Sequence, residues 1–240
     1  MEIREATTND GPAIRSIALW SLQTSYWVDV QTMKSAVMQW YSVDSFVDRL
    51  EDDDEFLLVA ERDDQPVAFS DSVLVDRRGD INWLHVAGNH RGEGIGRELY
   101  EATREHLEAN GAGTIRGLVL DINTDGNRFY ERCGLQKVSE RTVQVGDREF
   151  TENVYLDEDR EEPEAILVDG DDLYLDRADS ERGSKASFYV VYDDEDLETP
   201  YSYHCGNCES LVESIDPAGQ LVCEECDNHV EPTRWDAAYV

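Results

Sequence analysis

The sequence predicts an α/β fold for residues 1–157 and a separate, small β-rich metal-binding domain for residues 166–240. Three observations lead to this prediction. Strand-like and helix-like patterns alternate as far as Asp157, an acidic run broken by Pro163 follows, and two Cys-x-x-Cys pairs come after that run. The run at 158–165 has the composition of a linker.

The first elements follow from the spacing of apolar residues and from turn residues. Asp10 is expected to cap a helix that ends at Leu19. The polar sequence Asp63-Asp64-Gln65 is expected to join two antiparallel strands. The expected elements are a strand at 1–6, helices at 10–19 and 43–50, and strands at 55–62, 66–75 and 81–86.

The later elements alternate between helix and strand. Ile95, Leu99 and Leu107 have the spacing of one helix face, and Gly146-Asp147 has the composition of a hairpin turn. The expected elements are a helix from 94, a strand at 112–121, a helix at 126–133, hairpin strands at 136–145 and 148–156, and strands at 166–175 and 187–192.

The composition is strongly acidic, with 54 Asp and Glu against 21 Lys and Arg and a formal net charge of −33. Only Lys34, Lys137 and Lys185 are lysines. This composition resembles that of proteins from salt-accumulating halophiles, where a Debye length of about 3 Å near 1 M salt screens self-repulsion. An acidic protein of an ordinary cell is the alternative. Such a surface repels phosphate backbones, so no nucleic-acid partner is expected.

No apolar run approaches the roughly 20 residues of a membrane-spanning helix, and residues 1–6 are typical of an amphipathic strand rather than of a signal peptide. We therefore expect a cytoplasmic monomer or homodimer with no membrane partner.

A glycine-rich segment from Leu84 to Arg97 joins a predicted strand to a predicted helix. Gly92, Gly94 and Gly96 permit positive φ and close approach of the backbone. Amide N–H groups at the helix N-terminus then converge where the helix dipole favours an anion such as pyrophosphate. A tight turn or a mobile loop also needs glycine, so this segment alone leaves the function open.

The segment from Arg91 to Gly96 (RGEGIG) resembles the Arg/Gln-x-x-Gly-x-Gly/Ala signature of GNAT N-acetyltransferases. A second segment agrees, because Asn123 lies seven residues before Tyr130 in a sequence similar to the family's Phe-Tyr-Glu-x-x-Gly-Phe motif. The resemblance covers residues 1–157. It implies the GNAT fold: a mixed, mostly antiparallel central sheet with flanking helices and a V-shaped cleft between two splayed parallel strands.

The resemblance implies acetyl-CoA as co-substrate, with its diphosphate on the loop amides and its pantetheine arm paired to the preceding strand. It also implies direct attack of a primary amine on the thioester in a ternary complex, with a backbone N–H stabilising the oxyanion. The residues that it assigns to acetyl-CoA binding are Leu84, His85, Val86, Arg91, Gly92, Glu93, Gly94, Ile95, Gly96, Arg97, Asn123 and Tyr130.

By the same resemblance, Tyr130 is the general acid that protonates, or hydrogen-bonds, the departing sulfur, and a pKa near 10 suits that role. Simple packing of this aromatic on the sheet is the alternative. The general base stays open between His85 and water, because Leu118 stands where the subgroup that acetylates ribosomal-protein N-termini has a Glu. Cys133 is expected to be a buried small residue.

Aromatic residues gather between positions 21 and 42, at Tyr26, Trp27, Trp40 and Tyr41. Core packing is one interpretation of this cluster, and a lid on the substrate side is the other.

Cys205, Cys208, Cys223 and Cys226 form two Cys-x-x-Cys pairs separated by 14 residues, a spacing typical of a tetrahedral zinc site. Because sulfur fills all four positions, the expected Zn²⁺ is structural. The domain resembles small zinc ribbons that are fused to haloarchaeal acetyltransferases.

Residues 166–240 contain 19 acidic and 4 basic residues, so the ribbon is expected to contact a protein or to be a structural appendage rather than to bind DNA. Two functions remain. The first is an N-acetyltransferase that acts on a protein N-terminus or a small amine, and the complete motifs favour it. The second is an acyl-CoA-binding sensor whose ribbon recruits a protein partner.

Overall fold

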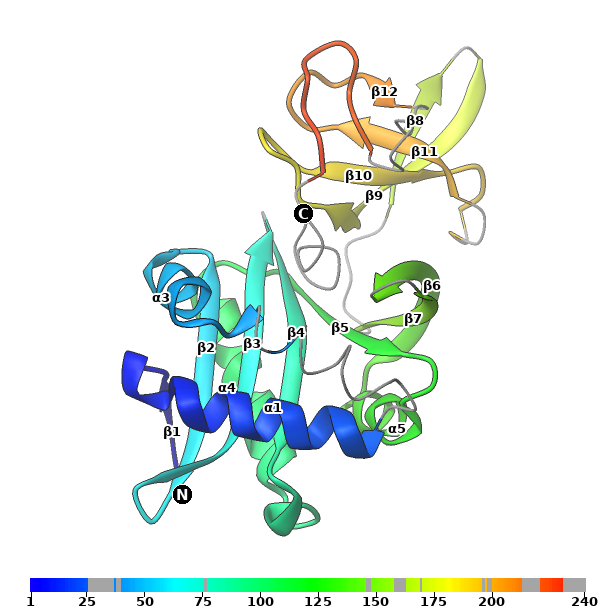
Figure 1. The fold of residues 1–240 in the computed structure, drawn as a ribbon. Coiled ribbons are helices and arrows are strands. Elements are labelled where there is room, and N and C mark those ends of the chain that lie inside the picture. The colour runs from blue at the N-terminus through cyan, green and yellow to red at the C-terminus, as the bar shows by residue number, and fades with distance from the viewer. Residues whose placement is uncertain are drawn as a thin grey trace. The chain divides into compact units, whose positions relative to one another are not determined.

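The computed structural model describes residues 1–25, 37, 40–75, 77–145, 148–157, 163–168, 170–195, 197, 200–212 and 221–230. The chain divides into two compact units at residue 158 (Figure 1). The first contains a seven-stranded sheet and the second a five-stranded sheet. Among the described helices, none has the length and apolar character needed to cross a membrane.

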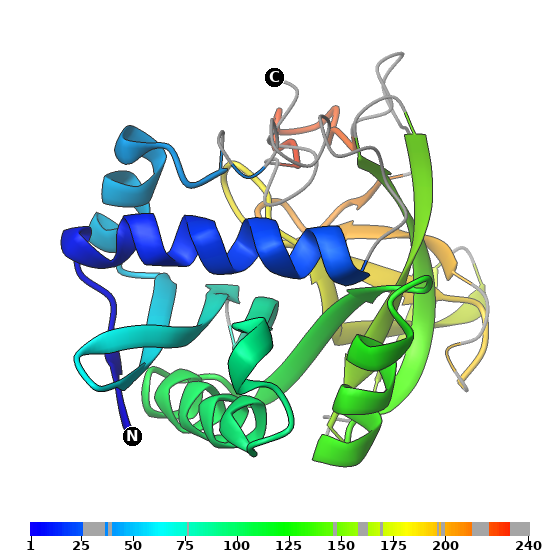
Figure 2. The ribbon, with the colours of Figure 1, turned by 60° about the horizontal axis from the view of Figure 1, so that its bottom comes forward.

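The first unit is a sheet with the strand order β1-β2-β3-β4-β5-β7-β6 and helices on both faces. Figure 2 shows α1 and α4 on opposite faces. The strands are β1 (Glu2–Glu5), β2 (Glu55–Arg62), β3 (Gln65–Val75), β4 (Arg78–Val86), β5 (Thr114–Leu120), β6 (Gln136–Val145) and β7 (Arg148–Leu156). The helices are η1 (Thr8–Asp10), α1 (Gly11–Ser25), α3 (Val43–Glu51), η2 (Gly88–His90), α4 (Ile95–Ala109) and α5 (Thr124–Cys133).

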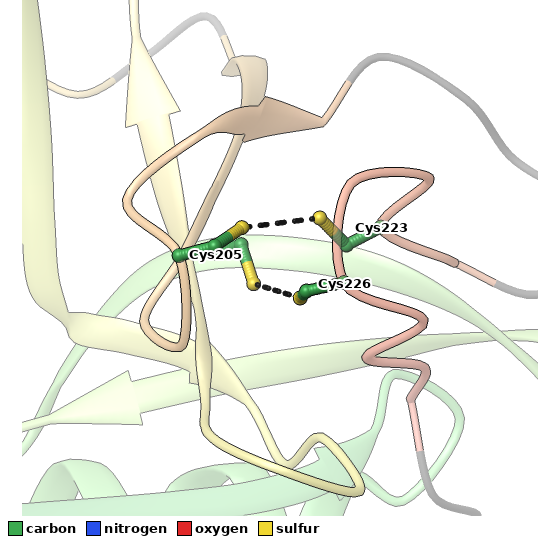
Figure 3. Close-up of side chains that lie close together, drawn as sticks. Cys205, Cys223 and Cys226 are labelled. Atoms are coloured by element: carbon green, nitrogen blue, oxygen red, sulfur yellow. Dashed lines mark hydrogen bonds between the residues drawn. The ribbon is translucent and has the colours of Figure 1, made fainter.

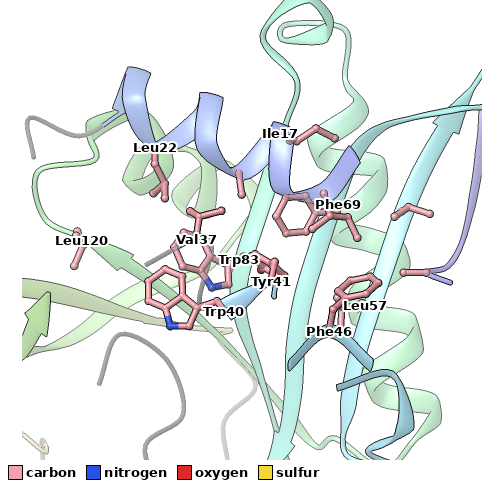
Figure 4. Packing of buried hydrophobic residues seen from close by; sticks show 14 residues of the cluster. Ile17, Leu22, Val37, Trp40, Tyr41, Phe46, Leu57, Phe69, Trp83 and Leu120 are labelled. Carbon is pink, nitrogen blue, oxygen red and sulfur yellow. The ribbon is translucent and has the colours of Figure 1, made fainter. Parts of the chain in front are cut away.

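The core beneath α1 explains why that helix is longer than expected. Its apolar face continues past Leu19 to Leu22, which is fully buried against the sheet, so the helix runs to Ser25. Phe69 of β3 and Trp83 of β4 meet this face from below (Figure 4). The predicted end at Leu19 was therefore wrong.

The parallel pair of β4 and β5 opens toward the C-terminal ends of its strands. The paired residues run from Arg78 with Thr114 to Ile81 with Gly117. Beyond this point the described parts of the two strands have no ladder in common, and this is the expected splayed pair of parallel strands. All other neighbouring strands of the sheet are antiparallel.

A buried charge cluster holds the closed end of this parallel pair together. Asp80 of β4 accepts two hydrogen bonds from Arg78 at 2.7 and 2.9 Å and two from Arg116 of β5 at 2.8 and 2.6 Å. All three side chains are buried. Burial by itself raises the pKa of Asp80, but the guanidinium groups of Arg116 and Arg78 outweigh it and hold the pKa well below its usual range.

Replacing Asp80 by Asn is expected to lower the free energy of unfolding by about 3–5 kcal/mol, because two buried guanidinium groups lose their counter-ion. Denaturant titration measures this, with Glu108→Gln in the exposed Arg104–Glu108 pair as a control worth at most about 1 kcal/mol. Since the folded pKa of Asp80 is depressed, its contribution is complete above the unfolded pKa of about 3.9 and declines as the pH falls below it. Equal stability of the two variants would contradict this account.

The second unit is an antiparallel sheet with the order β12-β11-β10-β9-β8. The predicted single strand at 166–175 was wrong: it is a hairpin of two strands, and Gly170 with φ of 99° lies in the turn. Apolar residues on both sides of this turn resemble one continuous strand in the sequence. The strands are β8 (Glu164–Val168), β9 (Asp171–Glu181), β10 (Phe188–Tyr192), β11 (Pro200–Cys205) and β12 (Leu211–Val212).

Candidate functional site

A cavity of about 490 Å³ opens where β4 and β5 diverge. All residues that the sequence assigned to acetyl-CoA binding line it except Glu93. Glu93 instead forms an ion pair with Arg62 of β2. The chain thus brings the glycine-rich loop and the later Asn-Tyr segment, which are separated in sequence, to one cavity.

The glycine-rich loop ends at Gly94, which caps the N-terminus of α4. Gly92 and Gly94 have φ of 80° and 86°, in the left-handed region. A Cβ atom at either position would meet nothing within 4 Å, so glycine is needed there for the backbone conformation and not for space. The first N–H groups of a helix have no intrahelical acceptor, so this end of α4 suits an anion.

Basic side chains line this end of the cavity, although the protein carries a net charge of −33. Arg97 donates to Glu101 at 2.8 Å and to the Arg132 carbonyl at 3.4 Å, and Arg132 itself lines the cavity. His90 and Arg91 lie on the same lining. The guanidinium groups of Arg91, Arg97 and Arg132 make the local field more favourable to a diphosphate than the composition suggests.

The Arg91 side chain turns toward α1 instead of along the loop. Its guanidinium lies 4.8 Å from the centre of the Trp20 ring and donates to Ser21 Oγ at 2.8 Å and to the Val86 carbonyl at 3.3 Å. Trp20 in turn packs on Gly88, where a Cβ atom would lie 2.0 Å from the indole. These contacts connect the glycine-rich loop to the first helix.

Ser21 lines the cavity, and no motif in the sequence indicates it. Its hydroxyl lies 2.9 Å from Nδ1 of His85, and both side chains are buried. His85 Nε2 is buried as well, and the rings of Phe69 and Trp83 pack against the imidazole. Nδ1 of His85 faces Ser21 and Nε2 is buried, which argues against this histidine as the general base in this conformation.

Tyr130 lies on α5 with its ring against β5. The ring fits over Gly117, where a Cβ atom would lie 2.5 Å from it, and it stacks on Tyr155 with 5.7 Å between ring centres. The hydroxyl donates to the Ile81 carbonyl at a long distance of 3.5 Å, at the point where the parallel ladder ends. The hydroxyl thus lies where β4 and β5 begin to diverge, and Tyr130 forms part of the cavity wall.

Asn123 caps the helix that carries Tyr130, since its Oδ1 accepts from Gly126 N at 3.0 Å. Asn127 connects this helix to the sheet, and sequence reasoning missed it. Its amide donates to the Leu120 and Asn123 carbonyls at 3.1 and 2.8 Å, and its Oδ1 accepts from Tyr155 at 2.9 Å. Both asparagines therefore position Tyr130, and direct contact of Asn123 with acetyl-CoA stays a prediction.

The four cysteines of the second unit form one cluster, in which all four Sγ atoms lie within 4.8 Å of one another. Sγ of Cys205 lies 3.7 Å from that of Cys226, and Sγ of Cys208 lies 3.5 Å from that of Cys223. Figure 3 shows Cys223 and Cys226 on one loop, facing Cys205. A tetrahedral ion with bonds of 2.3 Å separates its sulfur ligands by about 3.8 Å, so the cluster fits zinc.

Comparison with known families identifies both units. Residues 17–135 match the model of the acetyltransferase (GNAT) family. This part of the chain is a GNAT acetyltransferase domain. Residues 169–240 match a family of unknown function, DUF5816. A comparison with curated proteins found no match.

Several solved structures share the fold of the GNAT domain. The PaiA N-acetyltransferase of Thermoplasma acidophilum in complex with coenzyme A is 18% identical, with a TM-score of 0.55 over 63% of this chain and 96% of its own. The ribosomal-protein-alanine N-acetyltransferase of Brucella melitensis is 22% identical, with a TM-score of 0.51 over 65% and 98%. The ribosomal-protein-S18-alanine N-acetyltransferase of Escherichia coli is 18% identical, with a TM-score of 0.50 over 65% and 92%.

Replacing Gly94 by Ala in the GNAT domain is expected to weaken coenzyme A binding by about tenfold or more, because a left-handed conformation costs an L-residue about 1–2 kcal/mol and the loop relaxes away from it. Titration calorimetry measures the Kd. Gly111→Ala is the matched control, since Gly111 has φ of 108° and open space around it but lies at the far end of α4. Equal Kd values for both variants would remove the loop from cofactor binding.

The structure describes two of the four aromatic residues that gather between positions 21 and 42. Trp40 and Tyr41 are buried, with Trp40 5.1 Å from Trp83 between ring centres, which supports core packing for these two residues. The other two aromatics of the cluster, at positions 26 and 27, lie outside the described residues, so the lid hypothesis remains a prediction.

Partial burial raises the pKa of the Cys133 thiol to about 11, so Cys133 is no activated nucleophile.

Proposed function

We propose that the GNAT domain transfers an acetyl group from acetyl-CoA to a primary amine. The observation that carries this proposal is the cavity between β4 and β5, with the N-terminus of α4 at one end and Tyr130 in its wall. Acetyl-CoA supplies the acetyl group as a thioester. The N–H groups near Gly94 hold the diphosphate, and the open backbone of β4 after Ile81 pairs with the pantetheine arm.

The chain's own groups then act at the thioester. The Tyr130 hydroxyl donates a proton to the departing sulfur, which leaves as a thiol. A backbone N–H of β4 stabilises the negative charge that develops on the carbonyl oxygen. Because Nε2 of His85 is buried, its Nδ1 faces Ser21 and Leu118 carries no carboxylate, we propose that water accepts the proton that the amine loses.

The lack of a strong base among these residues favours a weakly basic acceptor. At pH 7 an α-amine with a pKa of about 7.8 loses its proton for about 1 kcal/mol, whereas a lysine side chain costs nearly 5 kcal/mol. We therefore propose a protein N-terminus or a small weakly basic amine as the acceptor. The names of two structures with the same fold specify a ribosomal-protein alanine.

Release of free coenzyme A thiol from acetyl-CoA tests this function. The acceptors are peptides with a free α-amine, the same peptides with a blocked N-terminus and one free lysine, and small amines. Turnover confined to the free α-amines and small amines is expected. Tight acetyl-CoA binding without turnover on any amine would instead support the acyl-CoA sensor.

For the second unit we propose a structural Zn²⁺ held by Cys205, Cys208, Cys223 and Cys226. The spacing of the four sulfur atoms supports it, and a full set of thiolates leaves no position for a catalytic water. The acidic surface of this unit fits contact with a protein better than contact with a nucleic acid.

We further propose that the protein works in the cytoplasm of a salt-accumulating cell. The melting temperature is expected to rise by several degrees between dilute buffer and molar KCl, because salt screens repulsion among the acidic side chains that give the net charge of −33. Differential scanning calorimetry measures it. The melting temperature of a near-neutral GNAT protein in the same buffers is the control, and an equal response of both proteins would defeat the proposal.

A further inference from the structure

A loop at 183–187, between β9 and β10, lies against both cysteine pairs. Gly206, within the first pair, donates its N–H to the Ser187 carbonyl at 2.8 Å. Ser184 N donates to the carbonyl of His229, just beyond the second pair, at 2.8 Å. The cysteine spacing did not indicate this loop as part of the metal site.

Asn228 connects the loop to the cluster and is fully buried. Its Nδ2 donates to the Ala186 carbonyl at 2.7 Å and lies 3.4 Å from Cys205 Sγ, while its Oδ1 accepts from Lys185 N at 2.8 Å. Its own carbonyl accepts from Cys223 N at 2.7 Å. The reversed amide would place an oxygen against the carbonyl and the sulfur, so the contacts fix this orientation.

Two glycines let the loop approach this closely. A Cβ atom on Gly183 would lie 2.3 Å from the Ala186 carbonyl oxygen and 2.6 Å from Asn228 Oδ1. A Cβ atom on Gly206 would lie 2.9 Å from the Ser187 carbonyl oxygen. A side chain at either position would force the loop and the cluster apart.

Contacts of Lys185 and Asn228 also stabilise the negative charge of the proposed zinc site. Four thiolates and one Zn²⁺ carry a net charge of −2, here within a protein whose own net charge is −33. Lys185 is one of the chain's three lysines, and its Nζ donates to the Cys226 carbonyl. Asn228 adds an N–H beside the Cys205 sulfur. Both donors lower the cost of gathering negative charge at the cluster.

We propose that Asn228 and Lys185 are outer positioning residues of the metal site and set its affinity for Zn²⁺. The inference rests on the proposed zinc site. Asn228 orients Cys205 and Cys223 together, and Lys185 places a positive charge at the second pair. Neither residue binds the ion.

Zinc affinity of the full-length protein tests the proposal, by competition with a chromophoric chelator. Asn228→Asp removes the amide donors at nearly constant size, and Lys185→Met removes the charge. A 10–100-fold rise in Kd is expected for Asn228→Asp. A smaller rise is expected for Lys185→Met, shrinking in molar KCl as salt screens an exposed charge. Asn110→Asp and Lys137→Met, both exposed in the first unit, are the matched controls and keep the wild-type Kd.

Co²⁺ serves as a second probe, because its absorption bands report tetrahedral coordination by four thiolates. If Asn228→Asp does not fold, the zinc Kd of Lys185→Met still tests the proposal. The Lys185 side chain is exposed, so replacing it leaves no buried cavity. A wild-type Kd for Lys185→Met at low salt, or for a folded Asn228→Asp, overturns the inference. Wild-type protein without the tetrathiolate Co²⁺ bands overturns the zinc site itself, which is a different result.

Discussion

Replacing Tyr130 by Phe is expected to lower kcat by about 10²–10⁴-fold, the usual contribution of a general acid, while the Kd for acetyl-CoA stays unchanged. The substitution removes one hydroxyl and leaves the ring stacked on Tyr155 and seated over Gly117. A steady-state thiol-release assay gives kcat, and calorimetry gives the Kd. An unchanged kcat would reduce Tyr130 to a packing residue.

Two further variants separate the hydroxyl from the ring that carries it. Tyr155→Phe removes a hydroxyl that donates to Asn127 rather than to the cleft, and should cost about 1 kcal/mol of stability with kcat near wild type. Gly117→Ala keeps the Tyr130 hydroxyl but pushes the ring away, because the new methyl group would lie 2.5 Å from it. A low kcat in Gly117→Ala, with acetyl-CoA still bound, would show that catalysis needs the Tyr130 hydroxyl at a defined position and not only its presence.

Removal of the proposed Zn²⁺ is expected to unfold the second unit and to leave the first unit folded. Structural zinc contributes about 10–16 kcal/mol of apparent binding energy to small domains, far more than a unit of this size can replace by burial. Cys223→Ser, which replaces a buried ligand, should act like a strong chelator. The melting transition of the first unit should persist, because that unit has its own core beneath α1.

Calorimetry and zinc content measured on the same samples check this prediction. Cys133→Ser is the matched control, since this cysteine belongs to the first unit and should change neither zinc content nor the second transition. A Cys223→Ser protein that retains both transitions would contradict a structural role for the metal.

Local patterns predicted the strands of the first unit to within a few residues, but not the end of its first helix. The hairpin of β6 and β7 and the strand β2 match their expected bounds, because alternating apolar residues and polar turns determine them within a few residues. The helix α1 continued beyond Leu19 because the core beneath it buries Leu22, which is a tertiary effect. The hairpin of β8 and β9 differs from the single predicted strand because the apolar pattern continues on both sides of the Gly170 turn.

The expected acetyl-CoA residues and the four cysteines followed from motifs, but the residues that contact them did not. Ser21 contacts His85 across 64 positions of sequence, and Asn228 contacts Ala186 across 42. No spacing or composition marks such a residue in a single sequence. Its role depends on which other segment the folded chain brings to it.

The sequence by itself determined the features that a few neighbouring residues control. These are the left-handed glycines before α4 and the two cysteine knuckles, because backbone conformation and ligand spacing are local properties. Only the tertiary structure decided that His85 faces Ser21, that the Tyr130 ring rests on Gly117, and that Asn228 joins both cysteine pairs. Those contacts join distant segments, and packing of the whole unit determines their geometry.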